Sequence, residues 1–233
     1  KKKITKQLGD GKLLSQLTKK KVVYDFRQND LKNDGQGAPL APIFHNALVS
    51  KINKKFNLKT PINILNIGGI SNVTFTINNN NLDEIYAYDI GPGNCLIDEW
   101  IRKNSKKRYD KDGLIAKSGK SDKLILNQAL ENFSSVINYK ESLDIKDFDI
   151  FFAKGLSLEN GAATITKFTA KLISDGMIYA HKDVKPWSYK WLVCGGGRKN
   201  KYLLENIKNN FEKLDLELID KYGINGDFIE SQA

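Results

Sequence analysis

An acidic residue followed by a glycine turn is the feature of this sequence that most clearly predicts chemistry. Asp89 ends an apolar run and is followed by Ile90-Gly91-Pro92-Gly93-Asn94, after which a helix is expected to begin near Cys95. A carboxylate in this position can accept or release a proton beside a helix N-terminus, where backbone N–H groups attract anions. Asp89 acting only as a turn-forming or capping residue is the alternative interpretation.

Two other glycine turns have the composition of phosphate-binding segments. Gly68-Gly69-Ile70-Ser71-Asn72 joins two predicted strands, and its glycines allow backbone N–H groups to approach phosphate oxygens while Ser71 and Asn72 add side-chain donors. An ordinary hairpin turn explains that segment equally well. Cys194-Gly195-Gly196-Gly197 ends a strand and opens a helix, where a nucleotide could lie on bare backbone. It lacks the third glycine of the dinucleotide-binding pattern.

Other kinds of site have little support in the sequence. His45 and His181 are far apart and share no ligand spacing, so no metal site is predicted. Neither a nucleophile elbow nor a Walker-type lysine loop occurs. The two cysteines, Cys95 and Cys194, indicate a reducing, cytoplasmic compartment, and the sequence has no apolar run long enough to cross a membrane.

The net charge of +10, from 37 basic and 27 acidic residues, raises the possibility of a nucleic-acid partner. Only Arg27, Arg102, Arg108 and Arg198 are arginines, and the lysines are scattered singly or in short runs. Base readout favours arginine, and no aromatic residues interleave with a basic stripe. We therefore interpret the charge as a compositional bias and expect no nucleic-acid partner.

Alternation and turn residues predict the order of the elements. Strands are expected at 22–26, 62–67, 72–77, 84–89, 189–194 and 214–219, and helices at 42–52, 95–103, 121–133 (capped by Ser121), 161–181 and 203–211. Residues 1–60 would be the remainder of a first domain with a connecting helix, and residues 61–233 a second domain. Three consecutive strands followed by helix–strand alternation predict an α/β fold, a mixed sheet with helices on both faces. This is the ordering of the ribonuclease H-like domain of sugar kinases, actin and heat-shock ATPases.

Taken together, these segments resemble the anhydro-N-acetylmuramic acid kinase family. The resemblance extends over nearly the whole chain, in order. The matching stretches are Gln7 to Gly11, Val23 to Arg27 with Asp30, Gly35 to Leu40, Leu65 to Thr74, Tyr88 to Asn94 with Asp98 and Trp100, Tyr109 to Gly113, Ser142 to Asp144, Val193 to Gly197 with Asn200, and Gly223-Ile224 with Glu230.

The resemblance implies a cytoplasmic enzyme of cell-wall recycling. It would open 1,6-anhydro-N-acetylmuramic acid with water and phosphorylate it, using ATP with Mg²⁺. Asp89 then matches the family's catalytic base. The nucleotide side would comprise Gly68, Gly69, Ser71, Gly91, Gly93, Asn94, Gly195, Gly196 and Gly197. The sugar side would comprise Gly35, Gln36, Gly37, Pro39, Asn72 and Glu230. A homodimer and no membrane partner are also expected.

Some features depart from the family pattern. The family's first phosphate loop and its His-Gly-Gln-Thr substrate segment are not in this sequence, and a helix has barely begun at residues 228–233. We therefore expect a piece of a longer protein that does not turn over ATP alone. Asp34 stands where the family usually has glycine. The alternative is a non-catalytic sugar-binding or regulatory relative, which would be favoured if the full gene also lacked the phosphate loop.

Overall fold

The computed structural model describes residues 8–35, 37–58, 61–76, 84–134, 139, 141–180, 182, 190–211 and 213–233. The chain forms two compact units, Lys1–Leu40 and Ala41–Ala233. This division differs from the expected boundary after residue 60, because helix α3 (Pro42–Phe56) packs with the strands of the second unit through Leu48, Val49 and Ile52.

The first unit contains two short helices, α1 (Gly11–Thr18) and α2 (Phe26–Lys32). The predicted strand over residues 22–26 is wrong, because residues 21–25 have no regular structure and lead directly into α2. A β-branched run becomes a strand only where a neighbouring strand accepts its backbone hydrogen bonds, and among the described residues of this unit there is no such strand. The side chains of Val23, Tyr24 and Phe26 are exposed.

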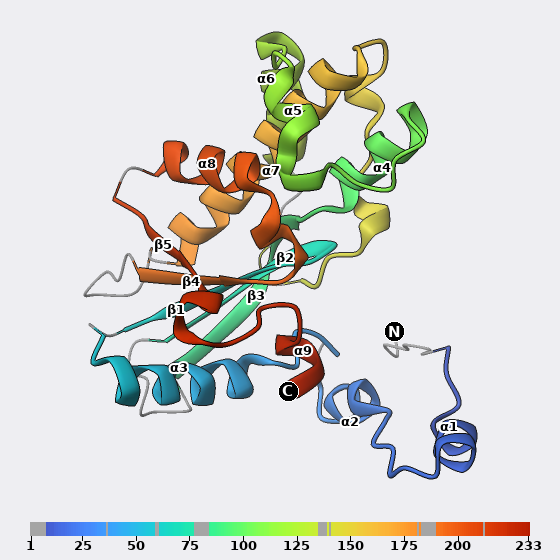
Figure 1. The fold of residues 1–233 in the computed structure, drawn as a ribbon, viewed down its shortest axis with the longest axis vertical. Helices are drawn as coiled ribbons and strands as arrows, with labels where there is room; N and C mark the ends of the chain where they lie inside the picture. The colour runs from blue at the N-terminus through green and yellow to red at the C-terminus, as the bar shows by residue number, and fades with distance from the viewer. Residues whose placement is uncertain are drawn as a thin grey trace. The chain divides into compact units, whose positions relative to one another are not determined.

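The second unit is built on a mixed sheet of five strands, as predicted (Figure 1). These are β1 (Asn63–Ile67), β2 (Ile70–Thr76), β3 (Ile85–Pro92), β4 (Lys190–Cys194) and β5 (Asp215–Leu218). They lie in the order β3-β2-β1-β4-β5, with β2 antiparallel to both neighbours and the β1–β4 and β4–β5 pairs parallel. The carboxyl ends of β1, β3 and β4 therefore meet at one edge of the sheet.

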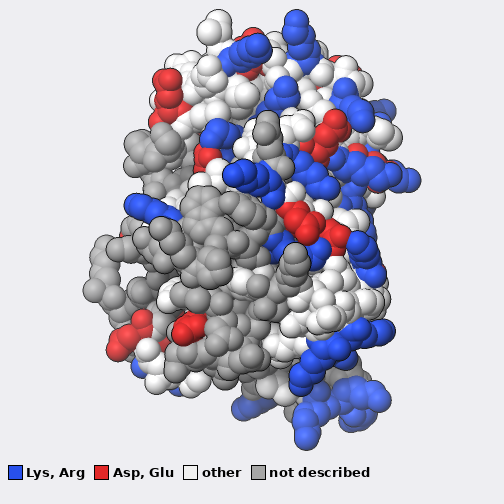
Figure 2. All heavy atoms as spheres, turned by 90° about the vertical axis from the view of Figure 1, so that its left-hand side faces the viewer, with Lys and Arg blue, Asp and Glu red and all other residues white. Residues whose placement is uncertain are grey.

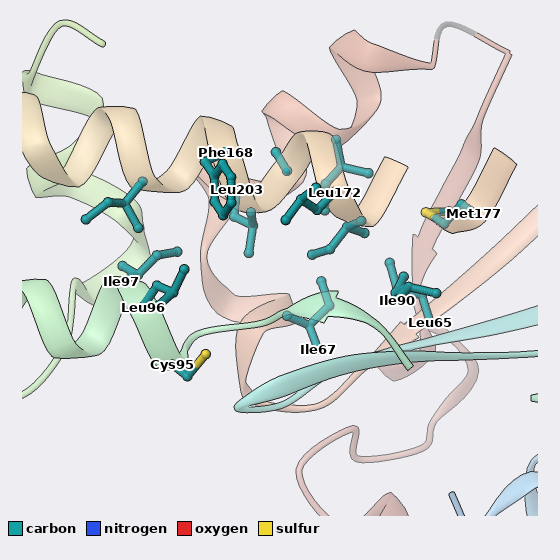
Figure 3. Close-up of a cluster of buried hydrophobic side chains, with 14 of the residues drawn as sticks. Leu65, Ile67, Ile90, Cys95, Leu96, Ile97, Phe168, Leu172, Met177 and Leu203 are labelled. Carbon is teal, nitrogen blue, oxygen red and sulfur yellow. The ribbon is translucent and has the colours of Figure 1, made fainter. Parts of the chain in front are cut away.

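One irregularity interrupts the pairing of β2 with β3. Ser71 pairs with Gly91 and Asn72 with Asp89, so Ile90 is an extra residue in a β-bulge. Ile90 is fully buried on the side of α7 (Figure 3), and a Cβ added at Gly91 would lie 3.2 Å from the Cβ of Leu172 on α7. Because of the bulge, the two successive positions 90 and 91 both face α7.

Helices cover both faces of the sheet, as predicted (Figure 1). On one face, α3 packs on a cluster that includes Ile64 and Leu192. On the other face lie α4 (Cys95–Asn104), α7 (Leu158–Ala180) and α8 (Lys201–Asn210). The strict alternation of β1 explains this division, because Leu65 and Ile67 point toward α7, as Figure 3 shows, whereas Ile64 and Asn66 project from the opposite face.

The remaining helices are α5 (Leu114–Ser118), α6 (Lys123–Ser134) and α9 (Ile229–Gln232). The predicted cap of α6 is wrong by one residue, because the Asp122 carboxylate, and not Ser121, accepts the N–H groups of Leu124 and Ile125, each at 3.0 Å. Helix α7 begins before the expected Gly161, whose missing side chain makes room for the Trp100 ring. The predicted Asn78–Asn81 turn lies outside the described residues. Across the described segments, no helix has both the length and the apolar character needed to span a membrane.

A network of charged side chains links β4 to β5, the strand at the edge of the sheet. Glu217 accepts hydrogen bonds from Lys190 at 2.8 Å, from Lys221 at 2.5 Å and from the Tyr222 hydroxyl. Burial alone would raise the pKa of Glu217, but these three donors outweigh burial and lower the pKa from 4.5 to about 2. The network therefore contributes stability above the unfolded-state pKa, and that contribution is lost as pH falls from about 4.5 toward 2.

We predict that Glu217→Gln lowers the free energy of unfolding at pH 7 and flattens its dependence on pH between about 4.5 and 2. Urea unfolding over that pH range measures both effects. The matched control is Glu205→Gln, since the ion pair of Glu205 with Lys117 at 3.6 Å is exposed and contributes little to stability. Parallel pH curves for wild type and Glu217→Gln would contradict the prediction.

Candidate functional site

Three glycine turns converge at the carboxyl edge of the sheet. The Gly68-Gly69 turn follows β1, the Gly91–Asn94 turn leads from β3 into α4, and the Gly195–Gly197 turn follows β4. The N–H groups of Gly93 and Asn94 donate to the carbonyl oxygens of Gly69 and Gly68, both at 2.8 Å. A Cβ added at Gly196 would lie 3.9 Å from the Asn94 amide nitrogen, so the third turn is adjacent to the second.

Two of these glycines are required by the space available. A Cβ at Gly93 would lie 2.2 Å from the Gly68 carbonyl oxygen, which is closer than any real contact. Gly195 has φ +78°, and a Cβ there would lie 2.4 Å from the Asn66 amide oxygen. The turns therefore pack backbone against backbone, while Gly69 and Gly196 are exposed and can receive phosphate oxygens.

Ser71 links two of the turns from inside. Its side chain is completely buried, and its hydroxyl donates to the Pro92 carbonyl oxygen at 3.2 Å. The sequence suggested that the Ser71 hydroxyl donates to phosphate. In the structure it donates instead to a carbonyl oxygen inside the protein, beneath the turns. Its proposed role at the nucleotide is accordingly to hold the Pro92 backbone.

Asp89 lies at the end of β3, just before the second turn. Its side chain is only 7% exposed, and Oδ2 accepts a hydrogen bond from the Leu143 backbone N–H at 2.9 Å. In the ladder Asp89 is opposite Asn72, and Asn72 is opposite Asn66, so the three side chains project from the same face of the sheet. A buried carboxylate thus ends a row of polar side chains beside the glycine turns.

Asn66 connects this row to Glu230, the residue of the predicted sugar side that lies at the start of α9. The Asn66 amide nitrogen donates to Glu230 Oε1 at 2.8 Å, and the Cys194 thiol lies 3.6 Å from the Asn66 amide oxygen as a donor. Burial raises the pKa of Cys194 to about 12, so the thiol keeps its proton. Asn66 was missed by sequence reasoning, although an amide inside the apolar run 62–67 is a signal that could have found it.

Arg198 is a second residue that sequence reasoning missed, and it holds the third turn in place. Its guanidinium is 5% exposed and donates to Asp220 at 2.7 and 3.0 Å, to Asp227 at 2.6 Å and to the Gly195 carbonyl oxygen at 3.0 Å. Hydrogen bonds to Asp220 and Asp227 raise the pKa of Arg198 further above its ordinary value. The cation is therefore paired inside the protein, which argues against a direct role at a phosphate.

One perturbed carboxyl group lies near the site without belonging to it. Asp98 is in the first turn of α4, and burial raises its pKa to about 6, an effect that Arg102 partly offsets and Asp110 reinforces. Asp110 is itself buried and accepts the N–H groups of Ile115 and Ala116, so it caps α5. Neither carboxyl group is on the polar row that carries Asp89.

The remaining predicted sugar-side residues are in the first unit. The Gly37 N–H donates to Asp30 Oδ2 at 2.6 Å, and a Cβ at Gly35 would lie 2.1 Å from the same oxygen. Asp34 has φ +64°, a conformation that favours glycine, which is the residue the family usually has there. Pro39 is half-buried, and Gln36 lies outside the described residues.

The described residues at this edge of the sheet do not form a metal cluster. Within the described part of the chain, no group of three or more His, Cys, Asp or Glu side chains is arranged to hold a metal ion. A cavity of about 380 Å³ with a mixed polar and apolar lining lies elsewhere, between α4, α6 and α7, with Phe133, Phe148, Phe152 and Phe168 in its wall. The candidate site thus consists of backbone turns beside one buried carboxylate.

The strand order, the antiparallel β2 and the glycine turns at the strand ends define a domain of the ribonuclease H-like class. A sequence model described as anhydro-N-acetylmuramic acid kinase matches residues 1–233. The chain belongs to the anhydro-N-acetylmuramic acid kinase family.

Named relatives agree with this assignment. An anhydro-N-acetylmuramic acid kinase of Pelagibacter ubique is 49% identical over 99% of this chain and 61% of its own length. Those of Brucella anthropi and Methylobacterium nodulans are 38% and 36% identical, over 98% and 99% of this chain and 58% of their own lengths. The chain therefore spans about three fifths of the length of these relatives.

A solved structure is also similar. It is the activator of the 2-hydroxyisocaproyl-CoA dehydratase from Clostridium difficile with bound ADPNP, which is 13% identical. The match covers 79% of this chain and 62% of that one, with a TM-score of 0.48.

Because the first two turns are in close contact, alanine substitutions at Gly93 and Gly69 should differ in their effect on stability. We expect Gly93→Ala to lower the free energy of unfolding by about 1–3 kcal/mol, because the new methyl group must push the Gly68 backbone away. Gly69→Ala is the matched control, since its nearest neighbour would be an Ile145 methyl group at 3.7 Å; we expect a change within about 0.5 kcal/mol. Urea unfolding measures both, and equal destabilisation by the two substitutions would contradict the prediction.

Proposed function

We propose that the full-length protein is an ATP-dependent kinase that opens 1,6-anhydro-N-acetylmuramic acid with water. The product is N-acetylmuramic acid 6-phosphate, formed in the cytoplasm during peptidoglycan recycling. Family membership supports the substrate class. The single observation that carries the proposal is the Asp89 carboxylate, buried at a strand end beside glycine turns.

In the proposed reaction, Asp89 acts as the general base. It accepts a proton from the water molecule whose oxygen bonds to the anomeric carbon, and the bond between that carbon and the 6-oxygen breaks. The 6-oxygen then bonds to the γ-phosphorus of ATP, and the bond to the ADP oxygen breaks. Asp89 afterwards releases its proton to solvent.

The glycine turns would hold the nucleotide. Phosphoryl transfer depends mostly on positioning and on stabilising negative charge, for which backbone N–H groups are suited. We assign this role to the backbone of Gly69, Gly91, Gly196 and Gly197. The N–H groups of Gly68, Gly93, Asn94 and Gly195 donate to carbonyl oxygens of the protein, so these residues, together with Ser71, would hold the turns in shape around the nucleotide. Mg²⁺ would enter with ATP as part of the substrate and neutralise phosphate charge, since this ion typically uses few protein ligands in addition to phosphate oxygens.

The sugar would contact residues on the polar row of the second unit. Asn72 projects from the same face as Asp89, and Glu230 is fixed by its hydrogen bond to Asn66. These positions suit groups that bind sugar hydroxyls near the proton acceptor. Gly35, Gln36, Gly37 and Pro39 are assigned to the sugar on the family resemblance alone.

Alternative functions make different predictions. A non-catalytic relative would bind the sugar or ATP without product formation. For a nucleic-acid partner, affinity for labelled DNA would fall steeply with salt concentration. On the face shown in Figure 2, acidic and uncharged side chains lie between groups of Lys and Arg side chains. A homodimer remains an expectation of the family resemblance.

The central test is Asp89→Asn in the full-length protein. Asparagine keeps the shape and an oxygen that can accept the Leu143 N–H but cannot take a proton, so kcat should fall by about 10²–10⁴. Because other segments supply most sugar and nucleotide contacts, KM should change little. Steady-state kinetics measures both.

Asp110→Asn is the matched control for this substitution. Asp110 is also a buried carboxylate that accepts backbone N–H groups, but it caps α5 and lies outside the polar row. We expect Asp110→Asn to lower Tm, since Ile115 and Ala116 each donate to a different Asp110 oxygen and the amide nitrogen of asparagine cannot accept one of these N–H groups; a lost hydrogen bond costs about 1 kcal/mol. The rate per folded molecule should be unchanged. If Asp89→Asn also melted at a lower temperature but kept a near-normal rate, Asp89 would be a structural residue.

A further inference from the structure

One loop, residues 143–148, lies against both Asp89 and the first glycine turn of the candidate site. At its start, the Leu143 backbone N–H donates to Asp89 Oδ2 at 2.9 Å, although the two residues are 54 positions apart. Two residues later, the Ile145 Cδ1 atom lies 3.7 Å from where a Cβ on Gly69 would be. We call residues 143–148 the carboxylate loop. It joins the proposed proton acceptor to the first glycine turn.

Reciprocal hydrogen bonds fix the shape of the carboxylate loop. The Asp144 N–H donates to Asp147 Oδ2 at 2.7 Å, and the Lys146 N–H donates to Asp144 Oδ1 at 3.0 Å. The Asp147 N–H also donates to the Asp144 carbonyl oxygen at 3.0 Å. This arrangement is a capping box around the 3-10 turn Ile145–Asp147. Because both aspartates accept backbone N–H groups, they determine how the peptide next to Leu143 is oriented.

The far end of the carboxylate loop is anchored in the hydrophobic core. Phe148 is 8% exposed and stacks on Phe133, with ring centroids 4.9 Å apart. Phe133 in turn meets the edge of Phe168 on α7 at 5.8 Å. With Phe148 fixed and the turn closed by its aspartates, the Leu143 N–H has one position relative to Asp89.

We propose that Asp144 and Asp147 are positioning residues for the reaction. They hold the Leu143 N–H on the Asp89 carboxylate and so fix the direction in which that carboxylate accepts a proton. A carboxylate bound by a backbone N–H cannot rotate freely about its χ2 bond, so its lone pairs keep one direction. This inference rests on the proposed function, because it presumes that Asp89 is the base.

The first experiment measures kinetics of the full-length protein carrying Asp144→Ala or Asp147→Ala. Small displacements of a catalytic group can lower rates by about 10²-fold, so we expect kcat to fall by about 10- to 100-fold. KM for ATP and for the sugar should stay within about twofold, because neither aspartate binds them in the proposal. Asp144→Asn should restore most of kcat, since asparagine also caps turns.

Asp122→Ala is the matched control. Asp122 is likewise a capping aspartate, since it accepts two backbone N–H groups at the start of α6, and none of its hydrogen bonds within the described segments involves Asp89 or residues 143–148. We expect it to lower Tm by about as much as Asp144→Ala and to leave kcat unchanged. A normal kcat in both Asp144→Ala and Asp147→Ala, or an equal loss of kcat in Asp122→Ala, would overturn the proposal.

A second experiment does not depend on activity. Hydrogen exchange of the Leu143 amide should be slow in the wild type and in Asp122→Ala, and at least tenfold faster in Asp144→Ala and in Asp89→Ala. Unchanged exchange in Asp144→Ala would overturn the role of the capping box. A full rate in Asp89→Asn would instead refute the proposed function, and the positioning of a base with it, whereas the exchange data would still report the loop contact.

Discussion

The site depends on how closely two stretches of backbone approach each other at one end of the sheet. Gly93 and Asn94 donate to the carbonyl oxygens of Gly69 and Gly68 over 2.8 Å, and no side chain fits between positions 93 and 68. This contact determines where β3 leaves the sheet and where α4 begins. Asp89 is only a few residues earlier on the same strand, so its place is fixed by the same contact.

The two faces of the sheet carry different kinds of side chain at the carboxyl edge. On the α7 face, apolar side chains such as Leu65, Ile67 and Ile90 form a continuous core. The α3 face carries the polar row of Asn66, Asn72 and Asp89, and burying polar side chains is favourable only if each of them is hydrogen-bonded. For Asp89 one partner comes from 54 residues away, and for Asn66 from 164. The candidate site is therefore complete only when distant segments have docked onto the sheet.

Residue alternation and glycine positions in the sequence predicted the features that depend on neighbouring residues alone. The alternation in 72–77 and the apolar run 62–67 predicted β2 and β1 closely, and the glycines marked all three turns. The predicted strand at 22–26 failed because strand formation needs a partner, which that stretch does not find among the described residues. The roles of Asn66 and Arg198 could not be predicted, since their partners lie 164 and 22–29 positions away and no local spacing specifies such pairs.

The bulge at Ile90 limits how this family can vary. A residue more or fewer at the bulge would exchange the faces of the sheet from which Gly91 and Pro92 project, just before α4 begins. Length variation between relatives should therefore concentrate away from the bulge.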